Sequence, residues 1–213
     1  MIKAIIFDVD NTLIKFSEIA APCFQKTALE LKLKKRSLEE ISKCFGTPAK
    51  KFVKRLWPSA NVEQFRKLTY QKILAQKVKP FPGALTLVKQ ISKKYRLGLL
   101  SCKPNILMYP HLKQIKLSQD LFEFIHSYDD IKYPKPDPRV FDKALDKLKL
   151  PPSEILYVGD SIHDAKAAMA AKLKFVAILT GHYSKEDFQK LGLKNTNILK
   201  SLKDLPRWLE ENG

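Results

Sequence analysis

The stretch KAIIFDVDNTLI, Lys3 to Ile14, is the part of the sequence from which the fold is predicted first. Its apolar run, Ala4–Phe7, leads directly into two carboxylates, Asp8 and Asp10. Because side chains two residues apart in a strand point to the same side, the two carboxylates face the same way. Neighbouring acids can divide labour, one ionised as a nucleophile or metal ligand and the other carrying a proton. Taken alone, the pattern also fits a strand that closes in an ordinary polar turn.

Four more short apolar runs follow along the chain and share one property. They do not alternate between apolar and polar residues, which is typical of strands buried on both faces of a parallel sheet. Segments with helical periodicity lie between them, so the sequence predicts an α/β fold with a Rossmann-like parallel-sheet core. The five predicted strands are Lys3–Asp8, Leu97–Ser101, Phe124–His126, Ile155–Val158 and Phe175–Leu179.

The alternation is interrupted once, directly after the first strand. Residues 16–79 contain no convincing strand, only amphipathic helical stretches. We therefore predict a core domain of residues 1–15 and 80–213 with an inserted all-helical cap domain, residues 16–79. The insert is either additional core or a lid, and its position beside the carboxyl end of a strand favours a lid. Its expected buried stripes are Ile19, Cys23 and Phe24, then Leu38 and Ile41, then Phe65, Leu68, Ile73 and Leu74.

A second acidic group lies in ILYVGDSIHD, where another strand runs into Asp160 and Asp164 follows four residues later. An acid at the start of a helix is often only a cap, and that interpretation stays open for Asp164. The carboxyl ends of parallel strands meet at one edge of a sheet, so these acids are expected to approach Asp8 and Asp10. Such a group would repel strongly unless a cation joined it. Oxygen ligands without a His or Cys cluster favour a hard ion, Mg²⁺ first.

Two other strand ends carry residues of opposite chemistry. Ser101 ends the run LGLLS, where its hydroxyl can hydrogen-bond a phosphoryl oxygen, although a lone serine is usually a turn residue. Lys135 lies between two prolines just beyond the third predicted strand. Because proline stiffens the backbone, this lysine is less mobile than most and can hold a phosphate.

Charge is the unusual property of the composition. The 213 residues include 39 Lys and Arg against 22 Asp and Glu, a net charge of +17, which favours an anionic partner. The lysines are interspersed with acids and no nucleic-acid motif is present, so a solvated basic surface is the simpler interpretation. Nucleic-acid binding is a rival hypothesis, which a salt-dependent gel shift would test.

Several classes are disfavoured. The three cysteines, Cys23, Cys44 and Cys102, form no CxxC pair, which argues against a zinc site or a disulfide framework. No apolar run approaches the ~20 residues needed to cross a bilayer, so we expect no membrane partner. The N-terminus lacks the pattern of a secretory leader, and the expected location is the cytoplasm.

Four motifs in order give the sequence a family resemblance: DVDNT at Asp8–Thr12, Ser101 in LGLLS, Lys135 in KPDP, and GDSIHD at Gly159–Asp164. The chain resembles hydrolases of the haloacid dehalogenase superfamily that carry a helical cap after the first strand. The segment PFPGA also resembles the sequence that follows this cap. The resemblance spans nearly the whole chain.

The resemblance implies a catalytic scheme. Asp8 would attack phosphorus and form an aspartyl-phosphate, and Asp10 would protonate the leaving alcohol and then deprotonate the attacking water. Ser101 and Lys135 would bind phosphoryl oxygens, with Lys135 also balancing the charge of Asp8.

It also implies a binding set. Asn11 and Thr12 would join Ser101 and Lys135 in binding the substrate. Mg²⁺ would be held by the Asp8 carboxylate, the backbone carbonyl of Asp10 and Asp160, with Asp164 in support. The implied partner is a small phosphorylated metabolite, and the implied assembly is a monomer or homodimer.

Alternatives within the family stay open. A phosphomutase would return the phosphoryl group to substrate, and the motifs do not separate it from a phosphatase. A 2-haloacid dehalogenase is disfavoured by Asp10, because a halide leaving group needs no proton. Two residues depart from the family pattern: Cys102 replaces a common Asn, and Lys172 replaces a common Gly.

Overall fold

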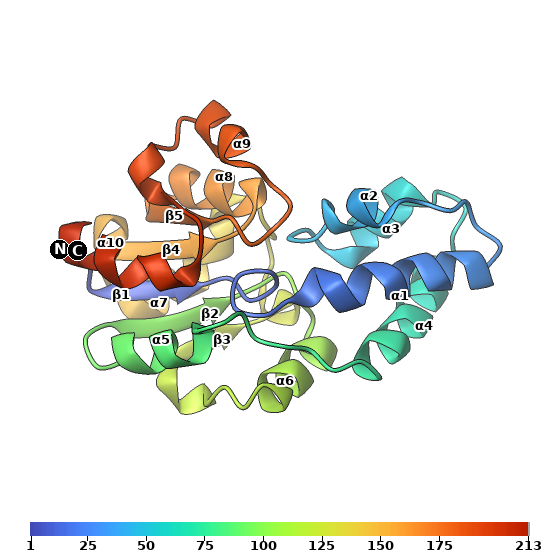
Figure 1. Cartoon of the computed structure of the whole chain (residues 1–213), viewed down its shortest axis with the longest axis horizontal. Helices are drawn as coiled ribbons and strands as arrows, with labels where there is room; N and C mark the ends of the chain where they lie inside the picture. Colours follow the sequence, from blue (N-terminus) through green and yellow to red (C-terminus); the bar gives the residue numbers. More distant parts are fainter. Residues whose placement is uncertain (213) are drawn as a thin grey trace.

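A six-stranded parallel sheet organises the computed structural model, which describes residues 1–212 (Figure 1). The strand order is β3-β2-β1-β4-β5-β6, and every neighbouring pair is parallel. The predicted α/β class with a parallel Rossmann-like core is therefore confirmed. The strands are β1 Ala4–Phe7, β2 Arg96–Leu100, β3 Phe124–His126, β4 Ile155–Gly159, β5 Lys174–Ile178 and β6 Ile198–Leu199.

Helices cover both faces of this sheet. In β1, Ile5 and Phe7 pack into one apolar cluster, whereas Ala4 and Ile6 pack into another on the opposite face. Because both faces are buried, the strands lack polar alternation, as their sequences indicated. The first cluster includes side chains of α5 Ala84–Ile91, α6 Asn105–Gln114 and α10 Leu205–Asn212. The second includes side chains of α7 Asp142–Leu148, α8 Ile162–Ala170 and α9 Lys185–Lys190.

All five predicted strands are present, each with its ends displaced by no more than one residue. The sixth, β6, was not predicted. It has two residues, Ile198 and Leu199, which pair with the end of β5. A segment this short carries no periodicity that a sequence reading can detect.

Four helices occupy the chain between β1 and α5 and lie at the far end of the molecule from the N-terminus (Figure 1). They are α1 Phe16–Glu30, α2 Leu38–Ser42, α3 Ala49–Leu56 and α4 Val62–Leu74. The amide of Lys15 donates to the carbonyl of Lys79 at 2.9 Å, and Phe81 donates to Leu13 at 2.9 Å. The chain therefore leaves the sheet and returns to it along two adjacent segments.

Of the nine residues predicted to be buried in this helical group, five are buried, Ile19 and Leu68 are half-buried, and two are exposed. Ile41, Phe65 and Ile73 are fully buried. Leu38 and Leu74, in contrast, are 44% and 38% exposed. Leu38 is the first residue of α2 and Leu74 the last of α4, where the chain turns away from the neighbouring helices.

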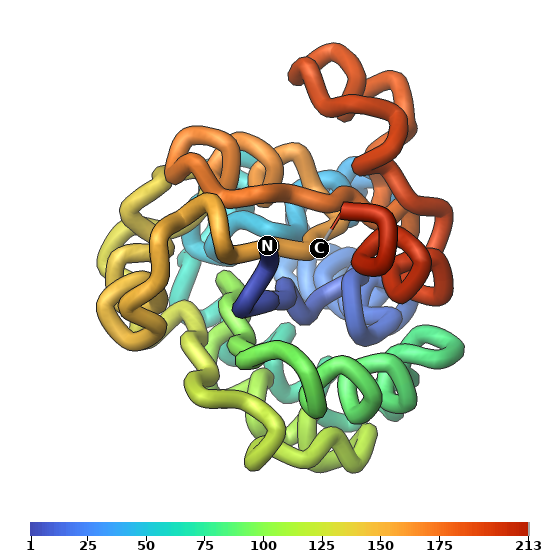
Figure 2. Tube along the Cα trace, turned by 90° about the vertical axis from the view of Figure 1, so that its left-hand side faces the viewer, coloured from blue at the N-terminus to red at the C-terminus, as the bar shows by residue number. Residues whose placement is uncertain are grey.

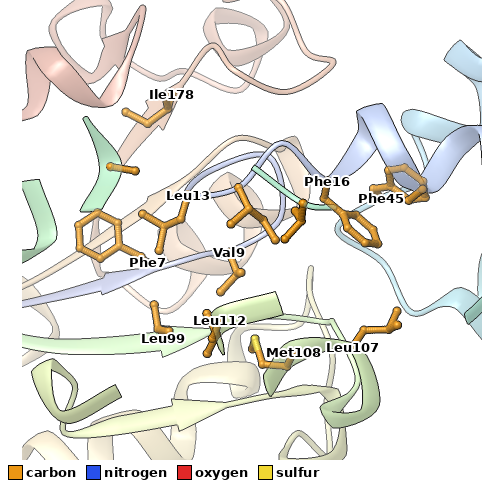
Figure 3. Close-up of a cluster of buried hydrophobic side chains, with 14 of the residues drawn as sticks. Phe7, Val9, Leu13, Phe16, Phe45, Leu99, Leu107, Met108, Leu112 and Ile178 are labelled. Carbon is orange, nitrogen blue, oxygen red and sulfur yellow. The ribbon is translucent and has the colours of Figure 1, made fainter. Parts of the chain in front are cut away.

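A continuous apolar core joins the sheet to the helical group. Figure 3 shows buried side chains running from Phe7 through Leu13 and Phe16 to Phe45. Viewed along the molecule from the N-terminal end, as in Figure 2, the α1–α4 group lies behind the sheet. Within residues 1–212, no helix is both long enough and apolar enough to cross a membrane.

Candidate active site

The site lies where the carboxyl ends of four strands meet. β1 lies between β2 and β4, and the later strands extend the sheet on both sides of it: β2 and β3 on one side, β4, β5 and β6 on the other. In open α/β sheets, a change in the direction of strand order such as this one creates a crevice beyond the carboxyl ends of the strands. Asp8, Ser101 and Asp160 directly follow β1, β2 and β4, and Lys135 enters from the loop after β3.

Lys135 is the centre of the buried hydrogen-bond network. Its ammonium group donates to Asp8 Oδ1 at 2.7 Å and to Asp164 Oδ1 at 2.6 Å. It also donates to the hydroxyl of Tyr157 at 3.0 Å, and its side chain is fully buried. Although burial alone lowers the pKa of Lys135, the charges of Asp164 and Asp8 raise it well above its usual range. Lys135 is therefore charged and fixed in position.

Asp164 holds Lys135 in place from the start of α8. Its Oδ2 accepts the amide of Ser161 at 3.0 Å and the Ser161 hydroxyl at 2.5 Å, which makes it part of a capping box. Its Oδ1 also accepts the Tyr157 hydroxyl at 2.9 Å. Burial works to raise the pKa of Asp164, but Lys135 and the other donors hold it below the usual value. Asp164 thus caps α8 and also contacts Lys135, while its predicted support of a metal ion stays a prediction.

Asp8 and Asp160 have fewer donors. The Thr12 hydroxyl donates to Asp160 Oδ1 at 3.2 Å and lies 3.5 Å from Asp8 Oδ2. Burial raises the pKa of Asp8 to about 7, although Lys135 opposes the shift. Burial and the negative charges of Asp164 and Asp8 raise the pKa of Asp160 well above its usual range. Both carboxylates would ionise more readily beside a cation.

The donor set at this point fits a divalent metal ion. One oxygen from each of Asp8, Asp160 and Asp164 lies within 4.8 Å of the others, and an oxygen-only set suits a hard cation. Gly181, in the loop after β5, contributes a close backbone approach: a Cβ there would collide with Asp160 Oδ2. Since the Asp164 oxygens already accept four hydrogen bonds, Asp8 and Asp160 are the freer ligands.

Asp10 has a buried partner that the sequence reading missed. The ammonium group of Lys103 donates to Asp10 Oδ1 at 2.6 Å and lies 3.4 Å from the centre of the Phe16 ring. Burial raises the pKa of Asp10, although Lys103 opposes the shift. Lys103 is 3% exposed, and burial lowers its pKa against the opposing effect of Asp10.

One cavity is lined both by Asp8, Asp10 and Lys103 and by residues of the helical group. The cavity lies between the carboxyl edge of the sheet and the first helices that follow β1. The catalytic candidates Asp8, Asp10 and Ser101 line it, and five of the twelve other lining residues are aromatic. Its lining residues are Asp8, Asp10, Phe16, Phe24, Phe45, Gly46, Thr47, Ala49, Phe52, Tyr70, Ser101, Cys102, Lys103, Pro104 and Leu107.

Asn11 and Thr12 lie beside the cavity without lining it. The Asn11 side chain accepts the amide of Ser17 at 2.9 Å, near the start of α1, and its carbonyl accepts the Thr180 hydroxyl at 2.6 Å. Its left-handed conformation, with a φ of 58°, suits an asparagine at a tight turn. The structure thus gives Asn11 a local structural role and gives Thr12 a contact with Asp160, while their predicted substrate contacts stay a prediction.

The fold and the site together define a parallel α/β enzyme with paired carboxylates at the sheet edge and a helical insert after the first strand. The chain belongs to the haloacid dehalogenase-like hydrolases, whose family model matches residues 5–178. The predicted family and the predicted enzyme class, a hydrolase of the phosphatase type, are therefore confirmed.

Individual relatives are similar over nearly the whole chain. A phosphoglycolate phosphatase from Nitrosospira multiformis is 27% identical over 202 residues, covering 89% of this chain and 88% of that protein. The pyrophosphatase PpaX from Halalkalibacterium halodurans is 27% identical over 209 residues, covering 96% and 95%. The crystal structure of a hydrolase from Pseudomonas syringae has a TM-score of 0.87 at 24% identity, covering 100% and 99%, and shows the shared fold.

Proposed function

We propose that this protein is a Mg²⁺-dependent phosphatase that hydrolyses a small phosphorylated metabolite through an aspartyl-phosphate on Asp8. One observation carries the proposal. Asp8, bonded to Lys135 at 2.7 Å, lines the same cavity as a second acid, Asp10, whose pKa is raised by burial. A fixed carboxylate beside a second carboxyl group that can take up and release a proton is the arrangement that a covalent route with an alcohol leaving group requires.

In the first step an Asp8 carboxylate oxygen forms a bond to phosphorus as the bond from phosphorus to the ester oxygen breaks. Asp10 gives its proton to that ester oxygen, so the alcohol leaves neutral. In the second step Asp10 takes a proton from water, the water oxygen bonds to phosphorus, and the bond to Asp8 breaks. The enzyme returns to its starting state with inorganic phosphate released.

The remaining residues of the site position charge. Ser101 directly follows β2 and lines the cavity, where its hydroxyl can donate to a phosphoryl oxygen. Lys135 holds Asp8 in orientation and stabilises the negative charge of the transferring group. When bound, Mg²⁺ would neutralise phosphoryl charge. Asp8 and Asp160 would hold it, together with the Asp10 carbonyl, which accepts no hydrogen bond from residues 1–212.

We further propose that residues 16–79 act as a cap domain on a core formed by residues 1–15 and 80–213. The structure supports this with two contacts across the site. The Tyr183 hydroxyl donates to the carbonyl of Lys43 at 3.1 Å. Gly46, whose φ is 91°, packs so that a Cβ there would lie 3.1 Å from Ser161 Oγ. A cap in this position excludes water from the reacting groups.

The names of the relatives support a small phosphorylated substrate. Both the phosphoglycolate phosphatase and the pyrophosphatase act, by their names, on compact phosphorylated molecules. The cavity lined by both the helical group and the core is small, which favours a compact substrate. The cytoplasmic location, the monomer or homodimer state and the disfavoured binding of nucleic acid stay predictions.

The direct test is hydrolysis of p-nitrophenyl phosphate by wild type and Asp8→Asn. We expect the variant to lose turnover by at least about 1,000-fold while its circular dichroism stays unchanged. Asp146→Asn, at an exposed position, is the matched control and should keep wild-type turnover. Chelation with EDTA should stop the wild type and added Mg²⁺ should restore it. Undiminished turnover by Asp8→Asn would refute the nucleophile assignment.

A further inference from the structure

Lys103 is a buried cation on the wall of the active-site cavity. Its ammonium group carries three N–H bonds, yet within residues 1–212 its one hydrogen-bond acceptor is Asp10, at 2.6 Å. Its other close neighbour is the face of the Phe16 ring, whose centre lies 3.4 Å away. The group therefore retains hydrogen-bonding capacity in a place where water is scarce.

The rest of the cavity offers an anion nothing comparable. Among the lining residues, Lys103 is the single lysine or arginine. Four phenylalanine rings of the helical group, here called the phenylalanine wall, line the same cavity: Phe16, Phe24, Phe45 and Phe52. Lys135, the other buried lysine of the site, is fully engaged with Asp8, Asp164 and Tyr157. A negative group on the leaving part of a substrate, away from the phosphoryl group assigned to Lys135 and Mg²⁺, would thus find Lys103 as the one lysine or arginine of this lining. Charge interactions are weakly screened in such surroundings.

The position of Lys103 limits where the negative group can lie on the substrate. Lys103 contacts Asp10, the residue assigned to protonate the ester oxygen, so its ammonium group lies beside the leaving side of the substrate. An anion that reaches Lys103 must be attached within a few bonds of the ester oxygen. A long or branched linker would instead meet the phenylalanine wall.

We propose that Lys103 selects substrates whose leaving group carries a second anionic group, a carboxylate or a phosphate, two or three bonds from the ester oxygen. The inference rests on the proposed phosphatase function and adds its substrate class. The bound anion accepts a charge-assisted hydrogen bond from Lys103 and shares that cation with Asp10. The aromatic wall then limits the substrate to a compact one.

A purely structural role for Lys103 predicts something different. If the residue served only as a counter-ion for Asp10, its loss would slow the hydrolysis of charged and neutral esters alike. If it selects the anion, its loss lowers the ratio between them. The selectivity ratio therefore separates the two roles, whereas the rate on a single substrate does not.

The experiment uses three phosphate monoesters built on the same two-carbon skeleton. They are 2-phosphoglycolate, with a carboxylate, ethane-1,2-diol bisphosphate, with a second phosphate, and 2-hydroxyethyl phosphate, which is otherwise neutral. kcat/KM is measured by phosphate release with Mg²⁺ for wild type, Lys103→Met and the control Lys113→Met, at an exposed position. In the wild type we expect at least one charged ester to be preferred over the neutral one by roughly 10- to 100-fold. Which charged ester is preferred identifies the carboxylate or the phosphate as the group that Lys103 binds.

Lys103→Met should bring the ratio to within about threefold of one, and Lys113→Met should keep it. A wild-type ratio near one overturns the inference even if Lys103→Met fails to fold, and so does an unchanged ratio in a folded Lys103→Met. If the wild type hydrolyses none of the three esters nor p-nitrophenyl phosphate, the phosphatase proposal itself has failed. If the wild type hydrolyses all three esters at equal rates, the selection by Lys103 is refuted and the phosphatase proposal stands.

Discussion

Replacing Lys135 with methionine should destabilise the protein strongly. The substitution keeps most of the side-chain volume but leaves two buried carboxylates, Asp8 and Asp164, without their shared cation. Removing one partner of a buried ion pair costs about 3–5 kcal/mol. Because the pKa of Lys135 is raised in the fold, its stabilising effect is complete below the ordinary lysine pKa and is lost only at higher pH. The full loss should therefore appear at pH 7.

Urea unfolding in the presence of EDTA, followed by the fluorescence of Trp57 and Trp208, measures this loss. Both tryptophans are buried, so their emission changes on unfolding. The matched control is Lys43→Met, which removes an exposed ion pair with Glu39 at 2.7 Å and should cost at most about 1 kcal/mol. If Lys135→Met were no less stable than this control, the reasoning about the buried network would be refuted.

Three further predictions concern groups around the site. His111 is buried with no hydrogen-bond partner for either ring nitrogen in residues 1–212, and burial and the charge of Lys103 lower its pKa to about 3. The folded state favours neutral His111, so the protein is fully stable in this respect above pH 6.5 and loses about 3 kcal/mol of unfolding free energy by pH 4.5. His111→Phe should flatten the pH dependence of the unfolding free energy in urea, and a pH dependence equal to that of the wild type would contradict this. Burial raises the pKa of Cys102 to about 11, so iodoacetamide should alkylate it at pH 8 roughly 100-fold more slowly than in the unfolded chain, and equal rates would count against its burial. Gly181→Ala should reduce turnover by at least about 10-fold because its Cβ collides with Asp160. Gly192→Ala, which strains a backbone with a φ of 83° but meets no neighbouring atom within 4 Å, should retain activity; retained activity in both variants would argue against a role for the Gly181 contact.

The residues that the sequence placed correctly share one property: each stands where an apolar run stops. Asp8, Ser101 and Asp160 directly follow β1, β2 and β4, and in a parallel sheet the carboxyl ends of the strands lie at one edge. Lys135 was identified by the prolines around it. These signals are local in the sequence, so no knowledge of packing was needed to read them.

The residues that the sequence reading missed depend on tertiary packing. Lys103 is one of 39 Lys and Arg residues, and nothing in its local sequence marks it as buried. Tyr157 reads as one more apolar residue of β4, although its hydroxyl bonds Lys135 and Asp164. The phenylalanine wall joins segments far apart in the helical group, and only its packing brings them together.

One departure from the family pattern has a backbone explanation. Lys172 follows α8 with a φ of 61°, in the left-handed region. Glycine adopts this conformation freely, which explains why relatives commonly carry it at this position. A lysine there costs roughly 1 kcal/mol and touches no catalytic group. The departure therefore concerns stability rather than chemistry.

The central claim, covalent catalysis by Asp8, is tested most directly by trapping the intermediate. Asp10→Asn should accumulate the aspartyl-phosphate from p-nitrophenyl phosphate, because this leaving group needs little protonation whereas the second step needs the base. Borohydride reduction after a rapid quench converts an acyl phosphate to an alcohol, and mass spectrometry of the peptide containing Asp8 locates it. We predict reduction at Asp8 that depends on substrate and Mg²⁺. Sustained turnover with no reduction at Asp8, or with reduction at another carboxylate, would contradict the mechanism.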